Sequence, residues 1–162
     1  MGEGIDDRRV DDCLLGLKKK GVKIMRVVVV YWSGTGNTEK MAKAVFEGAK
    51  QAGADVEIVT AAAFQTDRAY DAYAFGCPSM GSEELEDAEF APMFAAFESK
   101  LAGASIALFG SYDWGDGEWM RNWADRCRSL GAQMAAEPVI CQGEPEEEGI
   151  ASCQNLGKAL VS

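Results

Sequence analysis

The chain has 162 residues, which is enough for one domain with a substantial core and too few for two independent domains. With 48% hydrophobic and 26% charged residues it is typical of a globular protein, and its lack of histidine excludes Ser-His-Asp and Cys-His nucleophiles as well as His-ligated zinc or haem. The net charge of -10 argues against a nucleic-acid partner, because neutralising phosphates needs clustered cations.

Residues 1–24 differ in composition from the rest of the chain. They contain slightly more bases than acids, whereas the remainder carries the whole net negative charge. Val10, Cys13, Leu14 and Leu17 are spaced for one face of a short helix, although interspersed glycines weaken that helix. We therefore expect a mobile N-terminal extension or a short accessory helix over 1–24, followed by one domain over 25–162.

From residue 25 onward, short β-branched runs alternate with helical periods, a pattern that predicts an α/β fold with parallel strands and crossover helices. The strands are expected at 26–31, 55–60, 72–76, 105–110 and 138–142. One helix is expected between the first two strands, and further helices at 90–101, 118–130 and 147–161.

The segment from Ser33 to Thr38, SGTGNT, lies between the first strand and the first helix. A glycine turn at a helix N-terminus presents backbone N–H groups at the positive end of the helix dipole, and the hydroxyl and amide side chains add further donors. Neither a G-K-[S/T] sequence nor a G-x-G-x-x-G sequence is present, so Walker-type hydrolysis and dinucleotide binding are not indicated. The loop predicts a site for a terminal phosphate monoester.

Two further loops follow the third and fourth strands and are expected at the same edge of the sheet. One contains Met80 beside Gly81, and the other contains Trp114 beside Gly115. A thioether and an indole can hold a flat aromatic ligand between them, while glycines let the backbone approach its edge. Taken singly, each side chain is better explained by packing against the core. Together with the phosphate loop, the two predict a ligand clamp.

The chain resembles the short-chain flavodoxins of anaerobic bacteria. The segments that carry the resemblance are YWSGTGNTEKMA at 31–42, GCPSMGSEELEDAEF at 76–90, ALFGSYDWGDGEWM at 107–120 and EPEEE at 144–148. The resemblance implies a flavodoxin-like three-layer sandwich whose five-stranded parallel sheet has the order 2-1-3-4-5. It also implies a single non-covalent FMN and a role as an electron carrier, not an enzyme.

The resemblance also assigns roles by position. The loop amides and polar side chains of 33–38 would hold the phosphate, and Met80 and Trp114 would cover the two faces of the isoalloxazine. Glu83 would accept from flavin N3–H, the backbone of Trp114 and Gly115 would approach O2, and the Gly81 carbonyl would accept from N5–H after reduction. The candidate cofactor residues are Ser33, Gly34, Thr35, Gly36, Asn37, Thr38, Ser79, Met80, Gly81, Glu83, Ser111, Tyr112, Asp113, Trp114 and Gly115.

One position departs from the family pattern. Asp113 stands between Tyr112 and Trp114, where the family usually has glycine. Its carboxylate either turns to solvent or adds negative charge near the reduced flavin, and the sequence leaves the local backbone conformation open.

Acidic residues are expected to lower the reduction potential of the flavin and to select the redox partner proteins. A Gly81 carbonyl bonded to N5–H would favour the neutral semiquinone and separate two one-electron steps, while surrounding carboxylates would make the reduced protein a strong reductant. The run from Glu83 to Glu89 would steer basic redox partner proteins to the flavin edge, or would only form a solvated face. We expect a monomer.

Two other functions compete with the carrier. An FMN-dependent NAD(P)H:quinone or azo reductase needs an open flavin face, which Met80 and Trp114 argue against. A flavin-free binding module would not need the phosphate loop. The sequence shows no apolar run of membrane-spanning length, and its five cysteines lack a C-x-x-C pair, so no metal site is indicated and a reducing cytoplasmic location is expected.

Overall fold

The computed structural model describes residues 24–81 and 83–162. The extension expected over 1–24 therefore lies, apart from Ile24, outside the described residues. The elements in chain order are β1 (Arg26–Tyr31), α1 (Asn37–Gln51), β2 (Asp55–Thr60), β3 (Ala72–Gly76), α2 (Phe90–Phe97), the 3-10 helix η3 (Glu98–Lys100), β4 (Ser105–Tyr112), α3 (Glu118–Ser129), β5 (Gln133–Met134), β6 (Val139–Gln142) and α4 (Glu147–Val161).

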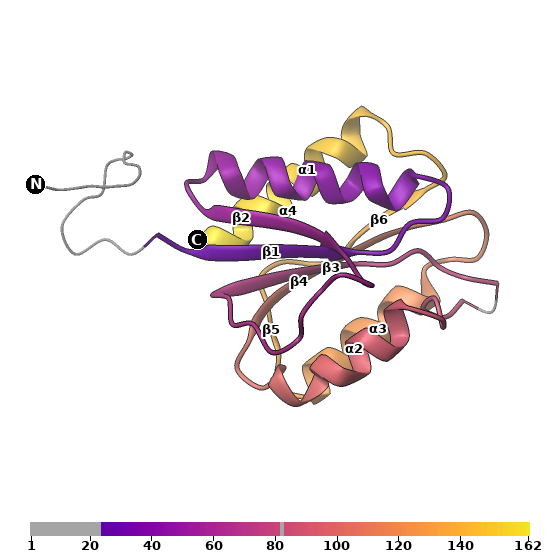
Figure 1. The fold of residues 1–162 in the computed structure, drawn as a ribbon. Helices are drawn as coiled ribbons and strands as arrows, with labels where there is room; N and C mark the ends of the chain where they lie inside the picture. Colours follow the sequence, from indigo (N-terminus) through magenta and orange to yellow (C-terminus); the bar gives the residue numbers. More distant parts are fainter. Residues whose placement is uncertain (1–23, 82) are drawn as a thin grey trace, which may run out of the picture.

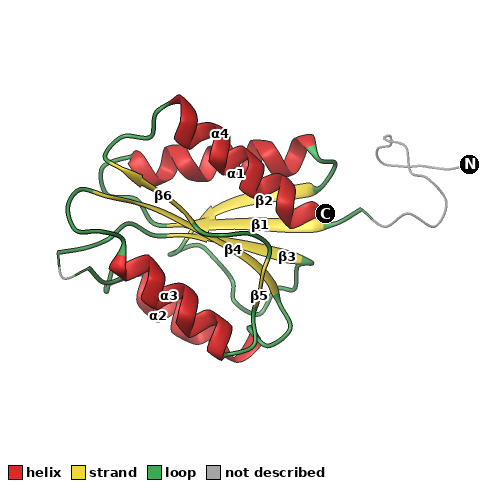
Figure 2. Ribbon diagram, turned by 180° about the vertical axis from the view of Figure 1, so that it is seen from behind, coloured by secondary structure: helices red, strands yellow, loops and turns green. Residues whose placement is uncertain are grey.

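A parallel sheet forms the middle of three layers, with α1 and α4 on one face and α2 and α3 on the other (Figures 1 and 2). Its strand order is β2-β1-β3-β4-β5, which confirms the predicted 2-1-3-4-5 arrangement. Sheets of this kind are covered on both faces, so their central strands are apolar at every position. The four valines Val27–Val30 of β1 are accordingly all fully buried.

The last position of the sheet is split, which differs from the single strand expected at 138–142. β5 pairs with Ser105 and Ile106 at the start of β4, whereas β6 pairs with Phe109–Tyr112 at its end. Between them lies Pro138, which has no N–H to donate to a ladder. The two-residue β5 was too short to show a strand pattern in the sequence.

The predicted helices are present, with small changes at their ends. The helix expected over 90–101 ends at Phe97 and continues as η3, and α3 ends one residue before the expected Leu130. α1 and α4 approach closely, because a Cβ added to Gly48 would lie 1.9 Å from the backbone oxygen of Gln154 and one added to Gly157 would lie 2.1 Å from that of Val45. These two glycines fix the spacing of the helix layer.

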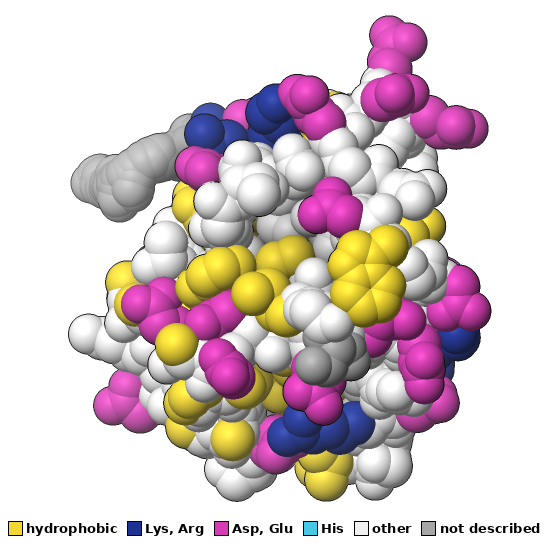
Figure 3. Space-filling view, turned by 90° about the vertical axis from the view of Figure 1, so that its right-hand side faces the viewer, with side chains coloured by type: hydrophobic (Ala, Val, Ile, Leu, Met, Phe, Trp, Pro, Cys, Tyr) yellow, Lys and Arg dark blue, Asp and Glu magenta, His cyan; other side chains and the backbone are white. Residues whose placement is uncertain are grey.

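The carboxyl ends of β1, β3 and β4 reach the same edge of the sheet, shown at the right of Figure 1. Seen face-on, this edge has hydrophobic side chains in its centre and many acidic side chains around them (Figure 3). The loops that the sequence singled out all begin here.

Candidate functional site

Three loops line a single cavity of about 260 Å³ at this edge. They follow β1, β3 and β4, and so come from the three neighbouring central strands. The lining residues are Trp32, Ser33, Gly34, Thr35, Asn37, Thr38, Pro78, Ser79, Met80, Gly81, Ser111, Tyr112, Asp113 and Trp114. All the candidate cofactor residues except Gly36, Glu83 and Gly115 are in this set.

The loop before α1 is shaped to leave backbone donors free. Gly36, the N-cap residue, has φ 97°, a left-handed conformation that favours glycine, and it has no side chain that could cap the helix. The Ser33 hydroxyl oxygen accepts from the N–H groups of Gly36 and Glu39. The hydrogen bonds among the described residues use neither the Thr35 N–H nor the Asn37 N–H. Such free donors at a helix N-terminus suit an anion.

Thr38 and Ser111 join the first loop to the third. Their hydroxyl oxygens are 2.8 Å apart and both side chains are buried. The Ser111 N–H also donates to the Thr38 hydroxyl at 3.4 Å. The Thr38 hydroxyl, expected as a phosphate ligand, therefore also holds two of the cavity walls together.

Two large apolar side chains on the cavity wall are unusually exposed. Met80 is 36% and Trp114 is 57% solvent-accessible, whereas the hydrophobic residues of the two cores, one on each face of the sheet, are buried. Neighbouring glycines give the backbone access beside each of them. Exposed apolar side chains that line a polar-rimmed cavity indicate a ligand-binding surface.

Glu83 and Gly115 do not line the cavity but lie against each other beside it. A Cβ added to Gly115 would be 2.7 Å from the Glu83 carboxyl carbon. One Glu83 carboxylate oxygen, Oε1, is buried and has no hydrogen-bond partner. Glu83 also has φ 52°, the only left-handed non-glycine residue in the described part of the chain. A buried acceptor without a donor is costly and requires a ligand or water to satisfy it.

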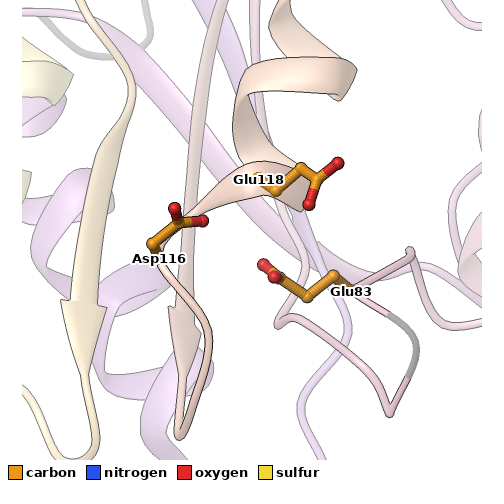
Figure 4. Close-up of side chains that lie close together, drawn as sticks. All are labelled: Glu83, Asp116 and Glu118. Carbon is orange, nitrogen blue, oxygen red and sulfur yellow. The ribbon is translucent and has the colours of Figure 1, made fainter.

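Glu83, Asp116 and Glu118 gather negative charge at this point (Figure 4). One carboxylate oxygen from each lies within 4.8 Å of the others. Asp116 also forms an exposed ion pair with Arg121 at 3.1 Å. The cluster adjoins Gly115 and so places anionic side chains next to the cavity.

Asp113 lies on the cavity rim in an ordinary backbone conformation. Its φ is not left-handed, so a residue other than glycine fits here without strain. The side chain is exposed, and no ion pair among residues 24–81 and 83–162 involves its carboxylate. Its backbone oxygen accepts from the Gln142 side chain at 3.2 Å.

Sequence reasoning missed three residues of this region. Trp32 and Pro78 line the cavity, and both directly adjoin loop residues that were singled out. Glu86 was grouped with the surface carboxylates, and this was wrong, because it is only 5% exposed and its carboxylate accepts backbone N–H groups of the following residues. Its position four residues before Phe90, at the start of a helix, was the available signal.

Comparison with known proteins gives a consistent result. The family described as Flavodoxin matches residues 29–157. The chain is 40% identical to a flavodoxin from Clostridium beijerinckii and 43% identical to one from Megasphaera elsdenii, in each case over 83% of this chain and 98% of the relative. The solution structure of two-electron reduced Megasphaera elsdenii flavodoxin superposes with a TM-score of 0.77 at 44% identity, covering 83% of this chain and 98% of that one.

Proposed function

The chain belongs to the flavodoxin family, whose members carry electrons on bound FMN and do not catalyse a reaction of their own. We propose that the cavity formed by the three loops binds this FMN, and that the protein transfers single electrons at low potential. The observation that carries the proposal is the convergence of free helix-end N–H groups with Met80 and Trp114 on one cavity. FMN supplies a group that can accept one or two electrons.

The residues present fit this group. The 33–38 loop provides backbone donors for a phosphate and no cation, so the phosphate would be held by hydrogen bonds and by the α1 dipole. Met80 and Trp114 would enclose the flat ring system. The orphaned Glu83 Oε1 would accept from the ring N3–H, which satisfies an acceptor that otherwise lacks a donor.

Gly81 would respond to the protonation state at N5. A Cβ built on Gly81 meets nothing within 4 Å, and glycine crosses between backbone conformations more easily than other residues. Its carbonyl can therefore turn toward the cavity and accept a hydrogen bond from N5–H. A carbonyl acceptor of this kind holds a proton at N5 and separates the two electron additions.

Carboxylates around the cavity would make it harder to add electrons to a flavin bound there. Glu83, Asp113, Asp116 and Glu118 lie beside it, and Arg121 is already paired with one of them. A unit charge at a distance on the order of 10 Å contributes about 0.4 kcal/mol in water and more at the lower effective dielectric near a protein surface. Several such contributions favour a strong reductant.

Redox proteins are the partners of a flavodoxin, and we propose that they dock with a basic surface on the acidic rim of the cavity. The rim carries exposed Asp113, Asp116 and Glu118 close in the chain to exposed Trp114. On this face, acidic side chains lie around hydrophobic ones (Figure 3). Complementary charge speeds encounter and orients the partner. We expect partner reduction to slow as ionic strength rises.

We further propose that the protein works as a monomer in the cytoplasm. In the described part of the chain, no helix is both long and apolar enough to span a bilayer. Cys77, Cys127, Cys141 and Cys153 are all free thiols, which suits a reducing compartment.

Riboflavin, which lacks the phosphate, tests the site. Two charge-assisted hydrogen bonds of about 1.5 kcal/mol each are worth a factor of roughly 150, so the apoprotein should bind FMN at least about a hundredfold more tightly than riboflavin. Flavin fluorescence quenching measures both constants. Equal affinity for the two ligands would remove the phosphate role of the 33–38 loop. Failure of both ligands to bind would refute the proposal altogether.

A further inference from the structure

The loop between β3 and α2 carries Met80, Gly81 and Glu83 and is fastened at its base. Cys77, at its first position, donates its N–H to the Phe109 oxygen, and its own oxygen accepts from the Trp119 indole N–H at 3.2 Å. The Cys77 sulfur accepts the Glu86 N–H at 3.3 Å. Both ends of the loop therefore meet at one buried point.

Glu86 ties that point to the helix that follows. Its carboxylate oxygens accept the N–H groups of Ala88, Glu89 and Phe90, each at 2.8 Å, and its backbone oxygen accepts the Ala91 N–H at the same distance. Burial by itself raises the pKa of a carboxyl, but these three donors outweigh it, and the pKa of Glu86 lies below its usual value. The side chain is thus held ionised at the start of α2.

Nearer the cavity, the loop is held by few contacts. The Met80 N–H donates to the Glu84 oxygen at 2.9 Å, and the Met80 oxygen accepts the Glu83 N–H at 2.8 Å. The Ser79 N–H donates to the Ser111 oxygen at 2.9 Å. Met80 is exposed on the cavity wall, and the buried Glu83 Oε1 beside the cavity has no hydrogen-bond partner. Their placement therefore depends on the geometry of the base.

We propose that Glu86 is a positioning residue for the cofactor: together with Cys77 it fixes the base of the β3–α2 loop, and this holds Met80 and Glu83 where the flavin ring binds. The inference rests on the proposed FMN site. The hydrogen bonds of Glu86 involve none of residues 33–38, which form the phosphate loop, so its effect is confined to binding of the flavin ring. A loop that is ordered before binding costs less entropy on binding, and loosening it weakens affinity.

The test is Glu86→Gln, which keeps the size of the side chain but brings an amide N–H₂ group toward backbone donors. We expect FMN and riboflavin to bind about tenfold more weakly, a change equal to about 1.4 kcal/mol. The ratio of the two affinities should stay at its wild-type value, because the phosphate loop is untouched. Flavin fluorescence quenching on the apoprotein supplies both constants, and calorimetry supplies its melting temperature.

Two controls separate positioning from stability. Glu89→Gln removes the same charge from the same helix end, where Glu89 makes no side-chain cap. Leu160→Ala destabilises the core on the opposite face of the sheet, where Leu160 is buried. Both should bind FMN within about twofold of the wild type. If Glu86→Gln does not fold, Cys77→Ala, which removes the buried sulfur that accepts the Glu86 N–H, should weaken both ligands several-fold.

Two results would overturn the inference. In one, Glu86→Gln melts earlier yet binds both ligands as the wild type does, which makes Glu86 only a helix cap. In the other, Glu86→Gln and Leu160→Ala weaken binding equally, so affinity follows global stability. Neither result touches the proposed function, which instead fails if the wild-type apoprotein binds no FMN.

Discussion

Replacing Gly115 by alanine should weaken FMN binding through Glu83. Gly115 has φ 91°, and its new Cβ would lie 2.7 Å from the Glu83 carboxyl carbon and 2.7 Å from its Oε2 atom. Contacts this short do not persist, so the carboxylate must move away from its buried position. The conformation itself costs an alanine about 1–2 kcal/mol.

The two costs can be separated with a matched glycine. Gly53 has φ 100° at the end of α1, and its added Cβ would meet nothing within 4 Å. Gly53→Ala therefore carries the backbone strain without the collision. At about 2–4 °C per kcal/mol for a domain of this size, each apoprotein variant should melt several degrees below the wild type.

Only Gly115→Ala should lose affinity. A hydrogen bond to a charged acceptor is worth about 1.5–3 kcal/mol, so displacing the Glu83 carboxylate should weaken FMN binding roughly 10- to 150-fold. Fluorescence titration of the two apoproteins gives the comparison. If Gly115→Ala binds FMN as tightly as Gly53→Ala does, Glu83 does not contact the cofactor and its assigned role is wrong.

Three further expectations concern potential, acid stability and packing. Asp113→Asn should raise the reduction potential of the second electron step by tens of millivolts. A charge on the order of 10 Å away contributes about 0.4 kcal/mol in water and about 1.7 kcal/mol at an effective dielectric of 20. An unchanged midpoint in spectroelectrochemistry would mean that this carboxylate is screened. Folding lowers the pKa of Glu86, so its contribution to stability is present above the unfolded pKa and is lost as the pH falls through the folded pKa. Urea titrations should therefore show that the difference in unfolding free energy between the wild type and Glu86→Gln shrinks in acid. A difference that does not change with pH contradicts this. Gly157→Ala should cost about 1–3 kcal/mol by forcing α1 and α4 apart, with FMN affinity unchanged as its check.

Most element boundaries followed from local signals, whereas the strand order followed from the family resemblance. β1 and β3 are buried on both faces and read as continuous apolar runs, and α1 has a glycine at each end. The cavity-lining loops could be found because parallel strands deliver their carboxyl ends to one edge. Glycine beside a large apolar residue then indicated where a flat ligand would sit.

The remaining features depend on contacts between distant residues, which a single sequence does not show. The split of the last strand depends on where β4 offers partners to β5 and β6, and a two-residue strand has no period. Glu86 looked like its exposed neighbours, because only the folded loop turns it inward. The left-handed Glu83 and its orphaned oxygen likewise follow from its packing against Gly115.

An anaerobic reductive titration of the FMN-loaded protein tests single-electron carriage most directly. If the Gly81 carbonyl holds a proton at N5 and the surrounding carboxylates oppose the second electron, a one-electron form with long-wavelength absorbance should accumulate before full reduction. Passage from the oxidised spectrum straight to the two-electron spectrum, with isosbestic points throughout, would contradict the account.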